Sequence, residues 1–308
     1  MVAPLPSLPF SHFLPILAGP TGSGKTKLVT SLSSDRFEAV SFDSRQVYSE
    51  LPIGTTMPTP EEQKDMPHHL VGTLYANESL NARSYSASAR KAVSEIWQKG
   101  KIPILVCGSG FYLRAFLNGM FPVPEILPHI KEEAQNMPLA EAIEIIKEKD
   151  ILALQNIGES DIYRIRRILE VVLSGTSWSD ISQVTVGGFL KEHPGLVVRG
   201  YWLDWNRDEL YARINERVLD LLTNGMIEET KIVLEKYGEA CPGLGSLGYN
   251  FALDFLHGNI DTNSFIERLA QSHRNYAKRQ VTWFRKDPLL LPATWKQVFD
   301  EFKNIEKI

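Results

Sequence analysis

The eight residues from Gly19 to Thr26, with the sequence G-P-T-G-S-G-K-T, restrict the possible folds of this chain more than any other segment. They follow an apolar run, Phe13 to Ala18, and lead into a segment from Lys25 to Ser33 whose apolar residues have helical spacing. A strand, a glycine-rich loop and a helix in this order form a P-loop, in which backbone N–H groups and the helix N-terminus face a phosphate. Within it, Lys25 supplies a full positive charge and the Thr26 hydroxyl is a ligand for Mg²⁺. The predicted phosphate-binding residues are Gly19, Pro20, Thr21, Gly22, Ser23, Gly24, Lys25 and Thr26.

Apolar runs and helical segments alternate along the first part of the chain. Ala39 to Phe42 and Ile102 to Val106 are uncharged and predict buried strands, and Ala82 to Gln98 between them has helical spacing. A further strand is expected from Leu196 to Leu203. This alternation indicates an α/β fold, a parallel P-loop NTPase-like sheet flanked by helices.

The character of the sequence changes after Gly119, where prolines interrupt it and no strand pattern follows. Residues 130–149 and 161–174 predict charged amphipathic helices. We therefore expect a helical insertion at 120–195 in a core made of 1–119 and 196–308. The rest of the core predicts helices at 208–222 and 227–237 and a long final helix at 262–285.

Composition excludes several classes of protein. The 308 residues carry a formal net charge of -4, which argues against a globally basic nucleic-acid binder but leaves a local basic patch open. The two cysteines, Cys107 and Cys241, have no CxxC spacing, so neither a disulfide framework nor a cysteine zinc site is expected. The first Lys or Arg is Lys25, unlike a targeting signal, and no run reaches the ~18 apolar residues of a membrane span. We expect a cytoplasmic protein without membrane contact.

A carboxylate is expected beside the phosphate site, but not where nucleotide hydrolases have one. Those enzymes place an acid at the end of a later strand, whereas here the strand to Val106 continues into Cys107-Gly108-Ser109-Gly110. Asp43 instead follows the second strand, and strand ends line the ligand crevice of such sheets. The alternative for a strand-end aspartate is a turn or helix cap. The adjacent His68 and His69 point to opposite sides and lack a third ligand, so structural roles are favoured over a metal site.

Several motifs then occur in one order along nearly the whole chain: G-P-T-G-S-G-K-T, S-F-D-S-R-Q-V-Y followed by I-G-T (53–55), G-S-G-F-Y (108–112), R-I-N-E-R (213–217), L-G-Y (247–249) and A-K-R-Q-V-T-W-F-R (277–285). Together they resemble the tRNA dimethylallyltransferase (tRNA isopentenyltransferase) family. The last motif is the most specific, since P-loop kinases and GTPases do not share it. The chain has no C-terminal Cys/His zinc module, so the resemblance is to the bacterial type.

The resemblance implies a reaction. A dimethylallyl group moves from dimethylallyl diphosphate to the exocyclic amine of the adenosine directly 3′ of a tRNA anticodon, with Mg²⁺ as cofactor. The P-loop would hold the departing diphosphate, Asp43 would accept the proton of the amine, and Arg217 would bind the diphosphate. Ser109 stands where threonine is frequent, and its hydroxyl would bond the bridging oxygen of the donor or the base. A monomer suffices to enclose one anticodon stem-loop.

The family pattern also implies contacts with the tRNA anticodon stem-loop, whose target base must turn out of its stack. The helical insertion would contribute some of them. The positions that match are Asp43, Ser44, Arg45, Gln46, Ser109, Lys131, Tyr163, Arg164, Arg166, Arg167, Gly248, Tyr249, Lys278, Arg279, Gln280, Trp283 and Arg285. Independently, Arg274, Lys278 and Arg285 have the spacing of one helical face, which predicts a basic stripe for a phosphate backbone.

Some residues depart from the family pattern. Cys107 stands where glycine is usual, His273 replaces a frequent threonine, and Gly245 and Asn250 replace basic residues frequent around the Gly-Tyr pair. None of these positions is Lys25, Thr26, Asp43 or Arg217. We expect the chemistry to be retained and the affinity for tRNA to differ.

Three alternatives stay open at this point. An adenylate isopentenyltransferase would share the core and the donor but use free AMP or ATP, and it would need neither the insertion nor the 277–285 helix. A small-molecule kinase would hold ATP in the P-loop, but no Walker-B acid or lid arginine cluster is evident. A non-catalytic tRNA-binding module would not need Lys25, Thr26, Asp43 and Arg217 together.

Overall fold

The structure is a computed structural model that describes residues 13–155, 157–158 and 160–307; the N-terminal segment on which the targeting prediction depends lies outside them. The chain forms two compact units. The core unit comprises Met1–Phe116 and His193–Ile308, and the inserted unit comprises Leu117–Glu192. The limits of 120 and 195 expected from the sequence lie a few residues from these boundaries.

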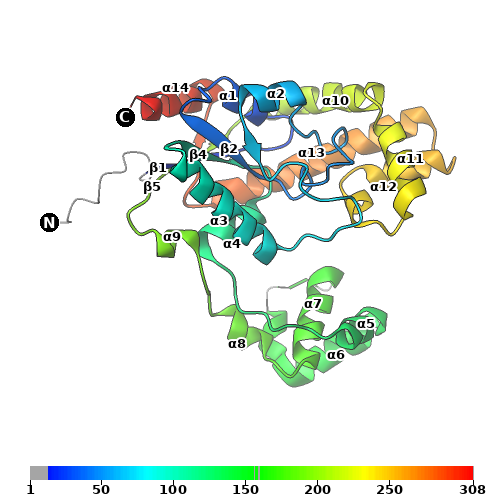
Figure 1. Cartoon of the computed structure of the whole chain (residues 1–308). Coiled ribbons are helices and arrows are strands. Elements are labelled where there is room, and N and C mark those ends of the chain that lie inside the picture. The colour runs from blue at the N-terminus through cyan, green and yellow to red at the C-terminus, as the bar shows by residue number, and fades with distance from the viewer. Residues whose placement is uncertain (1–12, 156, 159, 308) are drawn as a thin grey trace. The chain divides into compact units, whose positions relative to one another are not determined.

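The core unit contains a six-stranded sheet in the order β3-β2-β4-β1-β5-β6, and every pairing is parallel (Figure 1). The predicted α/β fold with a parallel sheet is confirmed. Strands β2 and β4 are buried along their whole length, and the one charged residue in them is Glu38 of β2. The sequence did not predict β3 and β6, which are too short to have a pattern. The strands are β1 (Phe13–Ala18), β2 (Phe37–Phe42), β3 (His68–His69), β4 (Ile102–Cys107), β5 (Val197–Leu203) and β6 (Leu291–Ala293).

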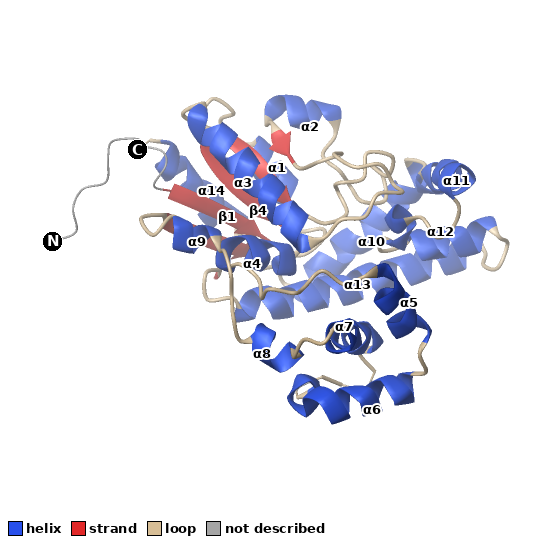
Figure 2. Ribbon diagram, turned by 60° about the horizontal axis from the view of Figure 1, so that its bottom comes forward, coloured by secondary structure: helices blue, strands red, loops and turns tan. Residues whose placement is uncertain are grey.

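Helices flank this sheet, as Figure 2 shows. They are α1 (Lys25–Thr30), α2 (Pro60–Asp65), α3 (Ala82–Gln98), α4 (Gly110–Asn118), α10 (Arg207–Thr223), α11 (Met226–Tyr237), α12 (Tyr249–Leu256), α13 (Thr262–Lys286) and α14 (Trp295–Glu306), with a short 3₁₀ turn at Pro242–Gly245.

The sequence predicted that the long helix at 262–285 is the final one. This prediction is wrong, because α14 follows α13. A capping box of Thr294 and Gln297 begins α14, and its apolar residues Val298 and Phe302 pack into the same cluster as Leu28 of α1 and Ile104 of β4. The capping box is a sequence signal that could have revealed this helix. Through α14, the end of the chain therefore covers the sheet beside the phosphate-loop helix.

The inserted unit is helical, with α5 (Pro128–Asn136), α6 (Leu139–Asp150), a 3₁₀ turn (Ile151–Leu154), α7 (Ile162–Leu173), α8 (Trp178–Ser182) and α9 (Phe189–Glu192). The single helix expected at 130–149 is wrong, because Pro138 holds Met137 in an extended conformation and separates α5 from α6. Ile165 and Leu169 of α7 are buried, but Ile162, which has the same helical spacing, is 52% exposed.

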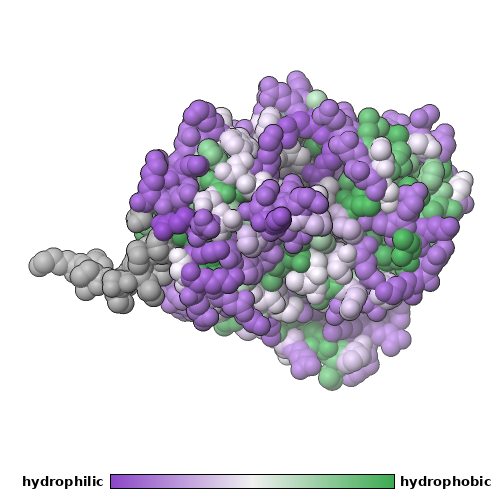
Figure 3. Space-filling model, turned by 45° about the horizontal axis from the view of Figure 1, so that its top comes forward, coloured by the Kyte–Doolittle hydropathy of each residue, from purple (hydrophilic) through white to green (hydrophobic). Residues whose placement is uncertain are grey.

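No helix among the described residues is both long and apolar enough to cross a membrane. On the face shown in Figure 3 the surface is mostly hydrophilic, with small apolar areas. Leu219 of α10 and Ile232 of α11 are among the exposed apolar side chains.

A buried ionic cluster joins strands β2 and β3 to the segment just before β4. Glu38 of β2 has a side chain that is only 3% exposed, and its carboxylate binds Lys99 (2.9 Å), His69 (2.8 Å) and Lys101 (3.0 Å). Burial disfavours the charged carboxylate, but the hydrogen bonds outweigh it and lower the pKa of Glu38 to about 2. His69 thus has a structural partner, and Nδ1 of His68 lies 2.7 Å from the Met66 carbonyl oxygen.

We predict that Glu38→Gln lowers the free energy of unfolding by about 1–3 kcal/mol at pH 7, because two lysines lose their buried acceptor. The contribution of Glu38 is complete above its unfolded pKa of 4.5 and is lost as the pH falls from there through its folded pKa of about 2. Denaturant unfolding at pH 7 and pH 3 should therefore give a smaller difference at pH 3. Glu95→Gln is the control, because it removes an exposed ion pair in which the Glu95 carboxylate lies 3.8 Å from the Lys91 amine. Equal losses at both pH values would contradict the prediction.

Candidate active site

Three loops of the core unit meet at the carboxyl edge of the sheet. The parallel register aligns Ala18, the last residue of β1, and Phe42, the last of β2, with Cys107 at the end of β4. Gly19, Asp43 and Gly108 are the next residues of the three strands and therefore leave the sheet side by side. The sequence placed Asp43 near the phosphate loop on the same argument.

These loops line a cavity of about 1210 Å³ together with residues of α10 and α13. Its volume exceeds the ~300–1,000 Å³ usual for a small-molecule pocket, so it has room for more than a phosphate group. Predicted site residues that line it are Thr21, Gly22, Ser23, Gly24, Lys25, Thr26, Asp43, Ser44, Arg45, Gln46, Arg217, Arg279 and Gln280.

The phosphate loop has the backbone that its glycines allow. Gly22 (φ 78°) and Gly24 (φ 85°) are left-handed, and Gly24 precedes α1 without any side-chain cap, so the first N–H groups of α1 stay available to a ligand. Lys25 donates hydrogen bonds to the carbonyl oxygens of Gly19 (2.8 Å) and Pro20 (3.1 Å). Burial lowers the pKa of Lys25 to about 8, and the charge of Asp43 opposes this shift.

Side chains from distant helices fix the loop. Gln280 of α13 accepts a hydrogen bond from the Thr21 N–H (2.8 Å) and donates one to the Gly108 carbonyl oxygen (2.7 Å). It is 6% exposed, so its side chain lies in the wall of the cavity and not on the surface where a tRNA contact was expected. On the other side, Arg213 of α10 donates to the Gly22 carbonyl oxygen (2.8 Å). The loop is thus held in shape without a ligand.

Asp43 faces the end of β4. One carboxylate oxygen accepts a hydrogen bond from the Arg45 N–H (2.9 Å), as in the turn-capping alternative. The other approaches Gly108, where an added Cβ would lie 2.7 Å from it. Ser109 is close by, since its hydroxyl oxygen accepts from the Ser44 N–H (3.4 Å). The structure therefore brings Asp43 and Ser109 together, and only glycine fits at position 108 without displacing the carboxylate.

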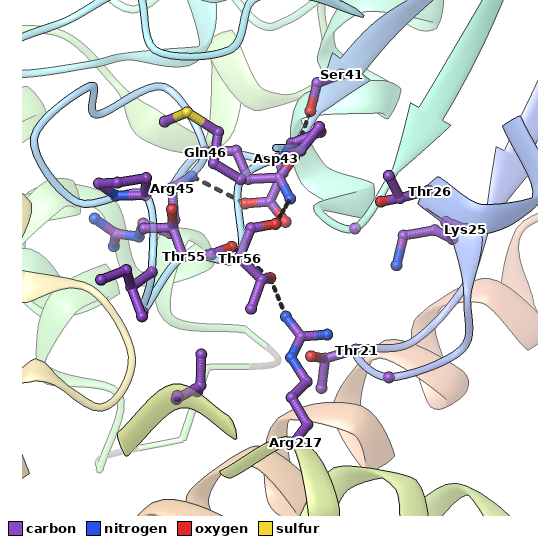
Figure 4. A pocket seen from close by; sticks show the side chains of 18 of the residues that line it. Thr21, Lys25, Thr26, Ser41, Asp43, Arg45, Gln46, Thr55, Thr56 and Arg217 are labelled. Atoms are coloured by element: carbon purple, nitrogen blue, oxygen red, sulfur yellow. Dashed lines mark hydrogen bonds between the residues drawn. The ribbon is translucent and has the colours of Figure 1, made fainter. Parts of the chain in front are cut away.

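Arg217 enters the cavity from α10. Figure 4 shows it pointing toward Thr56, with Lys25, Thr26 and Thr21 on one side of the open space and Asp43 on another. Arg217 donates a hydrogen bond to the Thr56 hydroxyl oxygen. Burial lowers the pKa of Arg217 to about 10, and Asp43 opposes the shift. Both cations therefore lie in a partly desolvated space near one carboxylate, which suits them to a highly charged anion.

Other predicted residues lie elsewhere. Tyr249 is fully buried and donates to Glu229 (2.7 Å), and Gly248 (φ 99°) precedes α12, where an added Cβ would overlap Leu269. The Tyr249 side chain is thus in the core, which is at odds with the predicted tRNA contact; a polar motif next to a loop does not reveal burial. Arg274, predicted on the basic stripe, donates to Asn215 (2.5 Å) and Gln271 (2.8 Å).

The exposed side of α13 forms a second, basic hollow of about 600 Å³. Its lining residues are Arg114, Asn275, Lys278, Arg279, Thr282, Trp283 and Lys286. Sequence reasoning missed Arg114, whose guanidinium lies 5.0 Å from the centre of the Trp283 ring. Arg285 is also exposed, at the end of α13.

The remaining predicted contacts lie in the inserted unit. Lys131 and Arg164 are exposed, and Tyr163 is 81% exposed at the start of α7. Two arginines of α7 have protein partners, because Arg166 donates to the Ala134 carbonyl oxygen (2.5 Å) and Arg167 pairs with Glu170.

Comparison with known proteins adds independent findings. A family model described as IPP transferase matches residues 46–287. The chain is 56% identical to a tRNA dimethylallyltransferase of Leptospira biflexa over 96% of this chain and 99% of that protein. It is 45% identical to a tRNA dimethylallyltransferase of Leptospira interrogans over 94% of this chain and 98% of that protein.

Solved structures are similar as well. A tRNA isopentenylpyrophosphate transferase of Staphylococcus epidermidis matches with a TM-score of 0.65 and 27% identity, covering 95% of this chain and 98% of that one. A eukaryotic dimethylallyltransferase described as acting on tRNA matches with a TM-score of 0.77 and 25% identity, covering 96% of this chain and 78% of that one.

The lowered pKa of Lys25 predicts how anion binding depends on pH. Above about pH 8 the free protein loses the Lys25 charge, so affinity for inorganic pyrophosphate should fall by up to about tenfold per pH unit. Pyrophosphate itself also titrates, and for that reason Lys25→Arg, which stays charged, is the reference. Calorimetric titrations from pH 7 to 9.5 should show the ratio of the two affinities changing above pH 8. A constant ratio would contradict the prediction.

Proposed function

The chain belongs to the IPP transferase family, as its motifs predicted, and on this premise we propose that it transfers a dimethylallyl group from dimethylallyl diphosphate to tRNA. The acceptor is the exocyclic amine of the adenosine directly 3′ of the anticodon, and diphosphate is released. The observation that carries the proposal is the joining of a phosphate loop, Arg217 and Asp43 in one cavity. A leaving diphosphate and a proton acceptor are what this reaction needs.

The reaction breaks one bond and makes one. The C–O bond of the donor breaks, and its electron pair leaves on the bridging oxygen of the diphosphate. The amine nitrogen bonds to the same carbon and loses a proton to Asp43. The carboxylate near Gly108 is suited to this because one of its oxygens is not occupied by the Arg45 N–H. Positioned proton transfer of this kind contributes roughly 10²–10⁴-fold to a rate.

Charge stabilisation of the leaving group falls to Lys25 and Arg217. Negative charge grows on the diphosphate as the C–O bond breaks, and both cations face the same partly desolvated cavity. The N–H groups at the start of α1 add further donors. With Gln280 and Arg213 holding the loop, these groups need little rearrangement during the reaction.

The residues present fit a Mg²⁺ ion. Mg²⁺ commonly takes few protein ligands and completes its shell with substrate phosphates and water. The Thr26 hydroxyl lines the cavity opposite Asp43, while the described residues contain no cluster of three or more His, Cys, Asp or Glu that would form a dedicated metal cage. When bound, Mg²⁺ would neutralise charge on the diphosphate, and Thr26 would hold it there.

Recognition of tRNA is proposed for two surfaces. The hollow with Lys278 and Arg279 offers a local positive patch on a chain whose formal net charge is -4, as phosphate-backbone binding requires. The exposed Tyr163 and Arg164 of the inserted unit would contact the anticodon stem-loop. The target base would turn out of its stack to reach Asp43. A monomeric, cytoplasmic enzyme stays a prediction.

An acceptor assay tests the function. Labelled dimethylallyl diphosphate and Mg²⁺ should label tRNA but not AMP, and without an acceptor no prenylated product should form. Asp43→Ala should reduce turnover by about 10²–10⁴-fold and leave tRNA binding intact. Asp65→Ala, an exposed aspartate at the end of α2, is the control. Labelling of AMP alone would show that the protein is an adenylate isopentenyltransferase and not a tRNA-modifying enzyme. Full turnover by Asp43→Ala would exclude Asp43 as the base.

Salt dependence tests the basic hollow. Lys278→Ala should weaken tRNA binding and reduce the slope of log affinity against log salt by about one, because one phosphate contact is lost. Lys91→Ala, which removes a lysine of α3 that is 80% exposed, is the matched control. Filter binding over a salt series gives the slopes, and an unchanged slope for Lys278→Ala would rule out that contact.

A further inference from the structure

We propose that Glu229 is a positioning residue for Arg217: it anchors the loop from Ile53 to Thr56, and this loop orients the Arg217 guanidinium toward the phosphate loop. The inference deepens the proposed function and rests on it for the activity measurements below. Glu229 lies on α11, outside the chemistry described so far, and no motif of the sequence singled it out.

Both carboxylate oxygens of Glu229 are used. One accepts a hydrogen bond from the Ile53 N–H (2.9 Å), and the other accepts from the Gly54 N–H (2.7 Å) and the Tyr249 hydroxyl (2.7 Å). The residue is 7% exposed. Burial raises the pKa of Glu229, and the three hydrogen bonds oppose this shift. The carboxylate thus accepts hydrogen bonds from two successive backbone N–H groups at the start of the loop.

Packing alone does not explain a carboxylate here. The other buried residues of α11 are uncharged, namely Met226, Ile227, Thr230 and Val233, and an apolar side chain at position 229 would fill the same space without desolvating a charge. What a carboxylate adds is direction, since two N–H groups bonded to two oxygens fix the orientation of the peptide as well as its distance.

The hydrogen bonds from the Ile53 and Gly54 N–H groups to Glu229 also bring two sequence motifs together. Gly54 of the I-G-T motif passes directly over Tyr249 of the L-G-Y motif, and a Cβ on Gly54 would overlap the Tyr249 hydroxyl. Tyr249 in turn holds Glu229 in place. A buried tyrosine and a glycine in separate motifs therefore serve one contact, which accounts for Tyr249 lying in the core.

Thr56, at the other end of the loop, contacts Arg217. Thr56 has a φ of 50°, a left-handed conformation that β-branched residues rarely adopt and that persists only where surrounding contacts impose it. Its N–H donates to the Ile53 carbonyl oxygen (2.9 Å), and its own carbonyl oxygen accepts from the Gln46 side chain (2.8 Å). In this conformation the Thr56 hydroxyl accepts the hydrogen bond of Arg217.

Arg217 depends on that contact. Among the described residues, the Thr56 hydroxyl is the one side-chain hydrogen-bond partner of its guanidinium, and its buried Nε atom has none. A long side chain with a single tether is oriented by the position of the tether. Release of Ile53 and Gly54 would shift Thr56 and with it the guanidinium, and misplacement of about 1 Å can reduce a rate by about 10²-fold.

Glu229→Gln keeps the size of the side chain but leaves one N–H facing an amide NH₂. We expect the affinity for inorganic pyrophosphate to fall about tenfold, the KM for dimethylallyl diphosphate to rise and kcat to fall, with the KM for tRNA unchanged. Tyr249→Phe should have a smaller effect in the same direction. Glu228→Gln, the exposed neighbour on α11, should leave all values unchanged.

A double-mutant cycle separates positioning from general stability. Thr56→Ala removes the tether, so Glu229→Gln should add little to the loss of pyrophosphate affinity in a Thr56→Ala background. Additive losses, or a lowered melting temperature with unchanged pyrophosphate affinity, would overturn the proposal. If Glu229→Gln does not fold, Tyr249→Phe provides the same cycle. Pyrophosphate binding needs no tRNA, so a wild-type protein that fails to prenylate tRNA would refute the proposed function without affecting this measurement.

Discussion

The parallel pairing of β1, β2 and β4 is the constraint on which the rest of the site depends. Because Ala18, Phe42 and Cys107 are in register, the phosphate loop, Asp43 and Gly108 leave the sheet at one edge and adjoin one cavity. Strands β2 and β4 are buried throughout, so this edge cannot shift without loss of the core. The chemistry therefore has a rigid base, and helices that come later in the chain complete the walls.

Positive charges outnumber negative charges among the side chains that line the cavity. The lining side chains include six cations, Lys25, Lys27, Arg45, Arg213, Arg217 and Arg279, against four carboxylates, Asp43, Glu62, Glu216 and Asp220. Burial lowers the pKa values of Lys25 and Arg217, so both charges are held at a cost that a bound anion would offset. A departing diphosphate accounts for this arrangement, and Asp43 supplies the acceptor for the proton released at the same step.

Local sequence patterns predicted the framework of the site but not its supports. The phosphate loop, the four longer strands and the position of Asp43 follow from short motifs and from alternation along the chain. Gln280 and Tyr249 were expected to contact tRNA because their positions match the family's tRNA-contact segments. Their burial depends on α13 and α12 packing against distant loops, although Ala277, Gln280 and Phe284 do share the spacing of one buried helical face. Glu229 gave no signal, since the two backbone N–H groups that it binds lie 175 and 176 residues away in the sequence.

Competition for the phosphate loop shows whether this loop holds the diphosphate of a prenyl donor or a nucleoside triphosphate. Equilibrium binding of labelled dimethylallyl diphosphate in the presence of Mg²⁺ can be measured with inorganic pyrophosphate or ATP as competitor. We expect one binding site per chain, displacement by pyrophosphate and little displacement by ATP at the same concentration. Displacement by ATP with no effect of pyrophosphate would contradict this expectation.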